Sequence, residues 1–234
     1  MSKMLFRTLL KSSCPVLNGM VFTAFEKVFS SNATSYYNDE ICSLALQNDG
    51  KIIAAGSSEI AGSGPAALAR YLTNGQLDTS FSDDGVALAG MSGYATFRTV
   101  TVQTDGQVVA GGADARFYTS AFLQKFSSGG TAGPSIGFQF SAADNAAFSQ
   151  TIVTSLISES DGSVLVGGFN DADAYIAHFS AALVQDSAFG NFPGGNVLLG
   201  QGNIVSLANS DDKIVVVTAS RYSDTGQATY RLFR

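Results

Sequence analysis

The sequence offers few side chains that could support acid–base or metal chemistry. His178 is the one histidine among 234 residues, which excludes a site built from several histidines. Any Ser-His-Asp triad would depend on this residue alone. In the internal repeat described below, His178 stands where other copies have Arg70 and Lys125. We therefore interpret it as a polar residue on the face of a strand, and the sequence predicts no catalytic residue.

The stretch Gly62-Ser63-Gly64-Pro65-Ala66-Ala67 has the G-x-G-x-x-A form of a dinucleotide-binding loop. Such a loop must be followed by a helix, here residues 67–72 (ALARYL). The repeat argues against this, because ALARY aligns with FLQKF and YIAHF, and the other copies have no matching glycines. We expect no nucleotide site and no cofactor.

Two short acidic clusters, residues 170–173 (NDAD) and 82–85 (SDDG), carry oxygen ligands that suit Ca²⁺. Neither has the full spacing of a calcium-binding loop, and turn formation explains both. Cys14 and Cys42 lie 28 residues apart and match no metal-binding spacing. We interpret them as unpaired thiols, with a disulfide as the alternative, and predict no metal site.

Composition excludes several classes of function. A net charge of −6 without a basic stripe argues against nucleic acid as a partner, and 45% hydrophobic residues argue against disorder. No apolar run approaches the roughly 18 residues of a membrane span. Lys3, Arg7 and Lys11 interrupt the apolar stretches at the N-terminus, so we expect no signal peptide. These features predict no particular cellular compartment.

A repeated pattern organises most of the chain. LQNDGKIIAAGSS (residues 46–58) returns as VQTDGQVVAGGAD (102–114) and SESDGSVLVGGFN (158–170), and more weakly as ANSDDKIVVVTAS (208–220). The shared aspartates are 56, 56 and 50 residues apart. Asp-Gly between two apolar runs is a strong hairpin signal, because glycine accepts the positive φ of a tight turn. Each copy therefore predicts a β-hairpin.

Two further apolar segments follow each hairpin. The first ends in an aromatic residue: ALARY (67–71), FLQKF (122–126), YIAHF (175–179) and TYRLF (229–233). A second run closes the first three units, beginning at Val86, Ile136 and Asn196. Each unit thus predicts four antiparallel strands in about 55 residues, apolar on both faces. Such sheets must stack on one another, and radial stacking gives a β-propeller, here most economically with four blades.

The first copy, LQNDGKIIAAGSS followed by ALARYLTNGQLDTSFSDDGVAL, resembles the delta-60 repeat, a bacterial propeller-forming repeat. The second copy lacks the LDTSF turn, and the third keeps it as Asp186-Ser187-Ala188-Phe189. The resemblance covers roughly residues 41–234. It implies a β-propeller fold without implying an activity, and it alone suggests an extracellular or surface assembly.

We expect an N-terminal tail over residues 1–19 and a propeller over residues 20–234. Its units span about 41–90, 97–142, 153–200 and 204–234. The last unit has three predicted strands, so residues 20–29 (MVFTAFEKVF) are expected to complete the last blade and close the ring. The alternative is a larger ring, completed by another chain or by further sequence.

Aromatic residues point to a candidate binding surface. In an antiparallel meander, the loops between second and third strands emerge at the same end as the links between blades. Tyr36, Tyr37 and Tyr94 lie in the links, Phe117, Tyr118 and Tyr222 lie in the loops, and the acidic residues nearby include Asp171, Asp173, Asp114 and Asp224. Loop tyrosines beside acids suit contact with a sugar or a protein surface. The alternative is that these tyrosines cap the blade core.

The sequence therefore predicts a non-enzymatic binding or interaction module that contacts a protein or a glycan through this end of the ring. Self-association is a further option. The alternative function is a structural component of a larger surface or particle assembly without a small ligand. A hydrolase or lyase built on the propeller is a third hypothesis, disfavoured by the low numbers of His, Lys and Glu.

Overall fold

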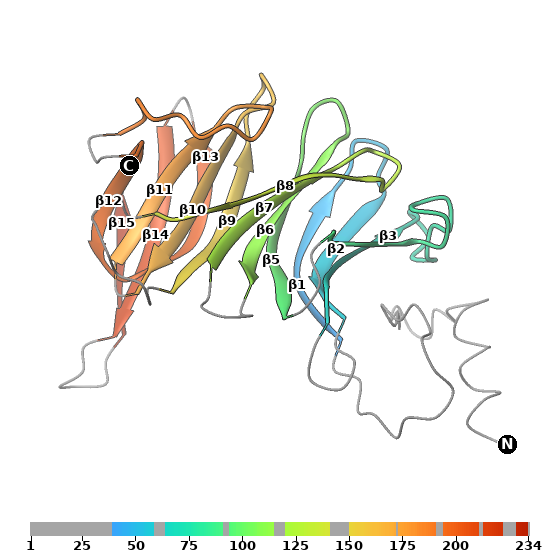
Figure 1. The fold of residues 1–234 in the computed structure, drawn as a ribbon, viewed down its shortest axis with the longest axis horizontal. Helices are drawn as coiled ribbons and strands as arrows, with labels where there is room; N and C mark the ends of the chain where they lie inside the picture. Colours follow the sequence, from blue (N-terminus) through green and yellow to red (C-terminus); the bar gives the residue numbers. More distant parts are fainter. Residues whose placement is uncertain are drawn as a thin grey trace, which may run out of the picture.

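The computed structural model describes residues 39–58, 64–90, 94–114, 120–140, 150–171, 173–190, 194–210, 213–221 and 228–233. Every regular element in these ranges is a β-strand, and the strands form four antiparallel sheets that follow one another along the chain (Figure 1). The predicted all-β propeller architecture of four blades is confirmed.

Within each sheet the strands lie side by side in chain order. The first two sheets consist of β1 (Glu40–Leu46), β2 (Ile52–Ser57), β3 (Ala66–Tyr71) and β4 (Val86–Leu88), then β5 (Ala95–Val102), β6 (Val108–Asp114), β7 (Ser120–Phe126) and β8 (Ala132–Phe138). The last two consist of β9 (Thr151–Ser158), β10 (Val164–Asn170), β11 (Asp173–Phe179) and β12 (Asn196–Gln201), then β13 (Asn203–Ser210), β14 (Lys213–Arg221) and β15 (Ala228–Phe233).

The repeated Asp-Gly motif forms the turn between the first and second strands of the first three sheets. Gly50, Gly106 and Gly162 have φ of 81°, 82° and 84°, a region that glycine enters without steric cost. The preceding aspartate accepts a hydrogen bond from the amide two residues later, as in Lys51 N to Asp49 Oδ1 at 3.1 Å. The hairpin prediction is correct.

The first strand of each sheet carries a β-bulge at the same place. One residue is left without a Cα partner opposite it, and that residue is Cys42, Arg98, Thr154 or Val205 in successive sheets. In the first three sheets a second-strand glycine at this point leaves no room for a side chain, whereas the fourth sheet has Thr218 there. A Cβ on Gly112 would lie 1.8 Å from the Thr96 carbonyl oxygen. Glycine at this position therefore lets the two backbones approach at the bulge.

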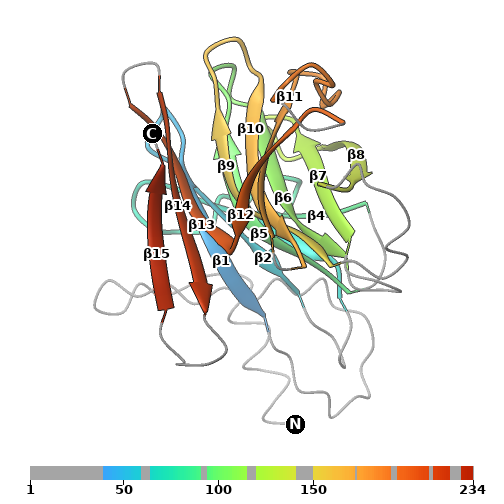
Figure 2. The same ribbon diagram turned by 90° about the vertical axis from the view of Figure 1, so that its left-hand side faces the viewer.

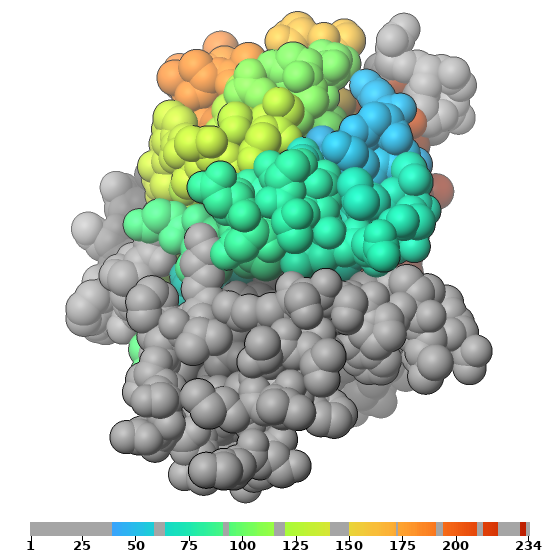
Figure 3. All heavy atoms as spheres, turned by 90° about the vertical axis from the view of Figure 1, so that its right-hand side faces the viewer, coloured from blue at the N-terminus to red at the C-terminus, as the bar shows by residue number. Residues whose placement is uncertain are grey.

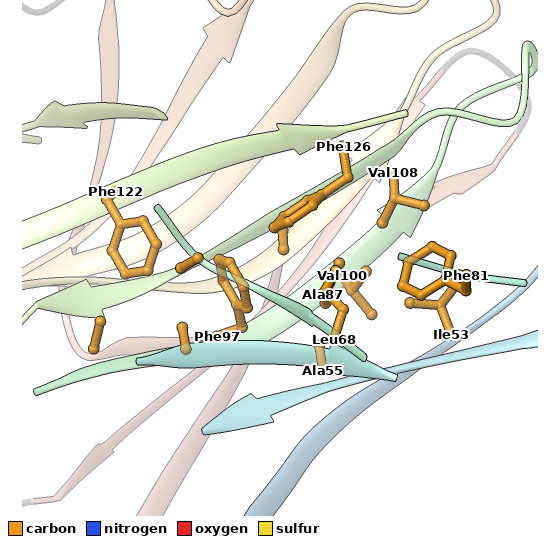
Figure 4. Close-up of a cluster of buried hydrophobic side chains, with 14 residues drawn as sticks. Ile53, Ala55, Leu68, Phe81, Ala87, Phe97, Val100, Val108, Phe122 and Phe126 are labelled. Atoms are coloured by element: carbon orange, nitrogen blue, oxygen red, sulfur yellow. The ribbon is translucent and has the colours of Figure 1, made fainter. Parts of the chain in front are cut away.

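Apolar side chains fill the space between successive sheets. Between the first and second sheets, Ile53 and Leu68 pack with Phe97, Phe122 and Phe126 (Figure 4). The Phe97 and Phe126 rings meet edge to face, with centroids 5.8 Å apart. A second cluster joins the second and third sheets, and another joins the third and fourth. The core is therefore a series of junctions between blades.

The four sheets form an arc in which each packs on the next (Figures 1 and 2). Seen from one end, the first sheet lies in front and the second lies behind it (Figure 3). In the described part of the chain, no comparable packing joins the fourth sheet to the first. The fourth sheet has three strands among the described residues. The expected closing strand, residues 20–29, lies outside them, as does the tail.

One detail of the sequence alignment is wrong. The pattern aligns TYRLF in the fourth unit with ALARY in the first. However, Tyr71 pairs with Ile52 at the start of β2, whereas Phe233 pairs with Val216, two residues further along β14 than the equivalent Ile214. Phe233 therefore does not occupy the place of Tyr71. A shift of two residues leaves the same side chains on the same face of the sheet, so the apolar pattern alone does not reveal it.

Candidate functional site

The strand topology divides the loops between two ends of the arc. The links between sheets and the loops between second and third strands share one end, which we call the loop face. The Asp-Gly hairpins and the turns after the third strands share the other end, which we call the hairpin face. This division follows from four antiparallel strands in sequence order, as the sequence predicted.

Tyr94 is the predicted loop-face aromatic that the structure describes. It immediately precedes β5, and 54% of its surface is exposed. Its place in the repeat corresponds to Gln150 before β9, which is also exposed. An exposed phenol at a strand end can stack on a ring and donate a hydrogen bond.

Asp171 and Asp173 lie in the tight turn between β10 and β11. Asp171 has a positive φ of 52°, and its Oδ1 accepts a hydrogen bond from the Gln150 amide at 2.9 Å. Its own amide donates to the Gln150 carbonyl at 2.9 Å. Asp171 therefore ties this turn to the start of β9, while Asp173 is half-buried. The pair is held in place by local structure.

Polar side chains continue beneath this turn. Thr151 is fully buried, and its Oγ1 lies 2.6 Å from Gln139 Oε1 and 3.2 Å from Asn170 Oδ1. Asn170 corresponds to Asp114 at the end of β6, and both residues are buried. Burial raises the pKa of the neighbouring Tyr175 phenol, and the charge of Asp173 adds to this effect. The loop face thus has buried polar side chains beneath its turns.

The remaining members of the predicted surface lie outside the described residues, namely Tyr36, Tyr37, Phe117, Tyr118 and Tyr222, and so does the nearby Asp224. The structure consequently places Tyr94, Asp171 and Asp173 at one end of the sheets, with the aspartates together and Tyr94 on the neighbouring blade.

A more elaborate charged cluster occupies the hairpin face of the first sheet. Arg70 Nε donates to Asp78 Oδ2 at 2.8 Å, and Lys51 Nζ lies 3.2 Å from the same oxygen. Arg70 Nη2 donates to Ser80 Oγ at 3.1 Å. Burial would raise the pKa of Asp78, but hydrogen bonds from Ser80 and Lys51 and the charge of Arg70 outweigh it and lower that pKa to about 2.

The same cluster links neighbouring blades. Arg70 Nη1 donates to the Ser128 carbonyl at 2.6 Å, in the turn after β7. Lys125, which occupies the equivalent place in β7, donates to the Ala181 carbonyl at 2.9 Å, in the turn after β11. The Gln103 side-chain amide likewise donates to the Gly162 carbonyl. These contacts join the first blade to the second and the second to the third, so we assign the cluster a structural role.

His178 occupies the place of Arg70 and Lys125, as the repeat predicted. Its Nε2 lies 3.1 Å from Glu159 Oε2 and its Nδ1 lies 3.4 Å from Asp186 Oδ2. These partners do not include an activated hydroxyl. His178 is thus a polar strand-face residue, and the aspartate that opens the LDTSF-like turn is its partner.

The other motifs are accounted for by turns and strands. Residues 66–71 form strand β3, so the helix required by a dinucleotide loop does not follow the glycines. In the SDDG cluster, Asp84 Oδ1 accepts the Val86 amide at 3.1 Å, and Ser82 and Asp83 have positive φ. The described residues contain no group of three or more His, Cys, Asp or Glu that could hold a metal ion. Cys42 is a half-buried free thiol.

Sequence reasoning missed the partner role of Asp78 and the two ends of the arc. The signal for Asp78 was available, because a basic residue in the third strand recurs with an aspartate eight residues later, as in Arg70 and Asp78, and in His178 and Asp186. The repeat pattern does not show which faces of the first and last sheets pack against another sheet, so the ends of the arc could not be predicted from it.

Comparison with known proteins supports the fold. A family described as "Domain of unknown function (DUF5122) beta-propeller" matches residues 47–81. This supports a β-propeller family, while the delta-60 name stays a resemblance. No curated protein matches the chain in sequence. Among the described residues, no helix is long and apolar enough to cross a membrane.

The solved structures that are similar to this chain belong to proteins of different kinds. A protein from Lactobacillus plantarum is 12% identical with a TM-score of 0.49, covering 83% of this chain and 55% of that one. The periplasmic gluconolactonase of Pseudomonas aeruginosa is 12% identical, with a TM-score of 0.45 and coverages of 92% and 60%. Sqt1 of Chaetomium thermophilum is 15% identical, with a TM-score of 0.43 and coverages of 78% and 41%. The chain thus spans between about two fifths and three fifths of these proteins.

Proposed function

We propose that this chain is a non-enzymatic interaction module whose loop face contacts a protein or a glycan. The observation that supports the proposal is the exposure of Tyr94 just before β5, at the end of the sheets where the sequence predicts the other loop aromatics. Tyrosine contributes a large contact area at low cost in conformational entropy and offers a hydroxyl for hydrogen bonding.

The chemistry of the described residues favours binding over catalysis. His178 is held between two carboxylates on the hairpin face, and Asp171 is used to fix a turn. The strongest charged cluster, around Asp78, joins two blades. A partner that presents hydroxyls and apolar ring faces, or a mixed polar protein surface, would fit an exposed tyrosine next to acidic turns.

A glycan array and a pull-down would test this proposal. Binding by the unaltered chain should weaken at least about tenfold when Tyr94→Ala is combined with Tyr36→Ala, Tyr37→Ala and Tyr118→Ala, because aromatic anchors dominate binding energy. The matched control is Val184→Ala, which removes an exposed apolar side chain from a turn on the hairpin face. Equal binding by the quadruple variant and the unaltered chain would refute the loop-face proposal.

A second candidate function is a structural component of a larger assembly. It is favoured by a separate observation, the exposure of large apolar side chains on the first and last sheets. A chain that assembles without a soluble ligand, and that shows no binding on the array, would support this function in place of the first.

A further inference from the structure

The turn that follows the third strand has the same hydrogen bonds in the first and third sheets. We call residues 72–81 the first turn and residues 180–189 the third turn. In both, an aspartate amide donates to the carbonyl of the basic residue in the preceding strand, at 2.8 Å in the first turn and 2.9 Å in the third. That basic residue is Arg70 in one sheet and His178 in the other. The side chains of two turns with one backbone design can therefore be compared directly.

The third turn contains a strained residue that the first turn lacks. Leu183 has a φ of 59°, in the left-handed region that bulky side chains rarely adopt. The equivalent residue is Gly75 in the first turn and Gly130 in the second sheet, and glycine enters this region without steric cost. The Leu183 side chain is buried in the cluster between the second and third sheets. The third turn therefore depends on side-chain contacts to keep its conformation.

His178 lies between two carboxylates that belong to different segments. Its Nε2 lies 3.1 Å from Glu159 Oε2, in the hairpin after β9, and its Nδ1 lies 3.4 Å from Asp186 Oδ2, in the third turn. A neutral imidazole has one N–H, so it donates to one of these carboxylates while its bare nitrogen faces the other. The protonated ring donates to both. The contacts of the two ring nitrogens are therefore complete in the charged ring alone.

The neighbouring elements present further charged groups, namely Asp161 in the hairpin after β9, Lys125 in β7 and Lys213 at the start of β14. Hydrogen bonds from Ser163 lower the pKa of Asp161, and the charge of His178 acts in the same direction. Lys125 donates to a carbonyl of the third turn at 2.9 Å, and Lys213 is exposed. Aspartate and lysine ordinarily keep their charges between about pH 5 and 8, whereas histidine does not. The histidine is therefore the group whose charge changes in this range.

The first sheet holds the same position with a permanent charge. Arg70 donates to Asp78 at 2.8 Å, and arginine stays protonated at every pH at which proteins are usually folded. Its guanidinium lies 4.7 Å from the centre of the Phe81 ring, and the His178 ring lies 5.5 Å from that of Phe189. The third sheet thus repeats the arrangement of the first with a basic group that can lose its charge.

We propose that His178 is a pH-sensitive clasp that holds the third turn to the hairpin after β9. The protonated ring contacts Glu159 and Asp186 together, so the clasp is closed below the pH at which histidine ordinarily loses its proton, about 6.5. As the pH rises through this range, the ring loses one N–H and one of the two contacts. The strained third turn then opens more often, whereas the first turn, which is held by arginine, does not change.

Amide hydrogen exchange followed by NMR tests the proposal on the whole chain. Protection factors, which correct for the intrinsic effect of pH, are compared at pH 5.5 and pH 8. Protection of the Asp186 and Phe189 amides should fall at least about threefold between these values, as expected for a partly exposed ion pair. The amides of Asp78 and Phe81 make the same backbone hydrogen bonds and should keep their protection, so they are the internal control.

The protonation state of the ring can be observed separately. Because the chain has a single histidine, its ring nitrogen signals show directly whether both nitrogens carry a proton at pH 5.5. The proposal predicts a doubly protonated ring at pH 5.5 and a neutral ring at pH 8. A neutral ring at pH 5.5 would overturn it.

Two substitutions separate the charge of the clasp from its packing. His178→Arg supplies the permanent charge of the first sheet and should keep the third turn protected at both pH values. His178→Gln keeps a polar side chain without the charge and should leave the turn equally weakly protected at both. Equal protection at the two pH values in the unaltered chain, or a pH dependence that persists in His178→Gln, would refute the clasp. Neither result bears on the loop face, whose residues lie at the other end of the sheets.

Discussion

At the scale of single residues, Asp78 of the Leu-Asp-Thr-Ser-Phe turn stabilises the contact between two blades. Its carboxylate receives the Arg70 guanidinium at 2.8 Å, and that guanidinium holds the next blade through the Ser128 carbonyl. Arg70 also lies 4.7 Å from the centre of the Phe81 ring. The Leu-Asp-Thr-Ser-Phe turn is thus explained by a junction between blades, and not by ligand binding.

Replacing Asp78 should destabilise the protein because it leaves a buried guanidinium without its counter-charge. We expect Asp78→Asn to lower the free energy of unfolding by about 2–4 kcal/mol at neutral pH. Asp186→Asn is the matched control, since its side chain is 45% exposed beside His178. That change should cost less than about 1 kcal/mol. Urea unfolding measures both, and equal losses would contradict the assigned role of Asp78.

The depressed pKa of Asp78 also predicts a pH dependence. A carboxyl whose pKa falls on folding, here from 3.8 to about 2, contributes stability that is complete above its unfolded pKa. This contribution, about 2 kcal/mol by linkage, is lost as the pH falls from 4 towards 2. The difference in unfolding free energy between the unaltered chain and Asp78→Asn should therefore shrink over this window. A difference that stays constant from pH 6 to pH 2 would be inconsistent with it.

Gly111 tests the junctions at the level of a single methyl group. A Cβ there would lie 2.9 Å from both Leu123 and Val153, so Gly111→Ala should destabilise the protein by about 1–3 kcal/mol through overpacking. Gly137→Ala, in β8 of the same sheet, has its nearest contact at 3.9 Å and should be tolerated. Thermal unfolding of the two variants gives the comparison. A neutral Gly111→Ala would show that the junction can relax.

At the scale of elements, the sheets differ in how many of their faces are packed. The second sheet is covered on both faces by neighbours, whereas the fourth has one described neighbour. Amides of β6 and β7 should therefore exchange hydrogen most slowly and those of β14 and β15 fastest. Hydrogen exchange with mass spectrometry measures this order, and slowest exchange in β14 would argue against it.

Most elements could be predicted from the sequence because local chemistry determines them. The Asp-Gly turns require positive φ, and the apolar runs of 4–8 residues between them can form little except strands. The strand order follows from short connections. The shift of Phe233 by two residues could not be predicted, since moving a strand by two leaves the same side chains on the same face.

At the scale of the whole molecule, the sequence predicts the blades better than it predicts their assembly. Every unit carries apolar residues on both faces, because every internal blade has two neighbours. The same pattern on the first and last blades therefore predicts burial for Leu44 and Leu232, and the arc leaves both exposed. The candidate site was predictable only as an end of the sheets, because loop position follows from topology while side-chain contacts such as that of Asp171 with Gln150 do not.

The central claim is that the chain binds a partner through its loop face, where Tyr94 is exposed. A glycan array and a pull-down with the unaltered chain, the Tyr94→Ala variant and the Val184→Ala control test it most directly. We predict a partner whose binding weakens markedly in Tyr94→Ala and is unchanged in Val184→Ala. Equal binding by all three chains would contradict the account.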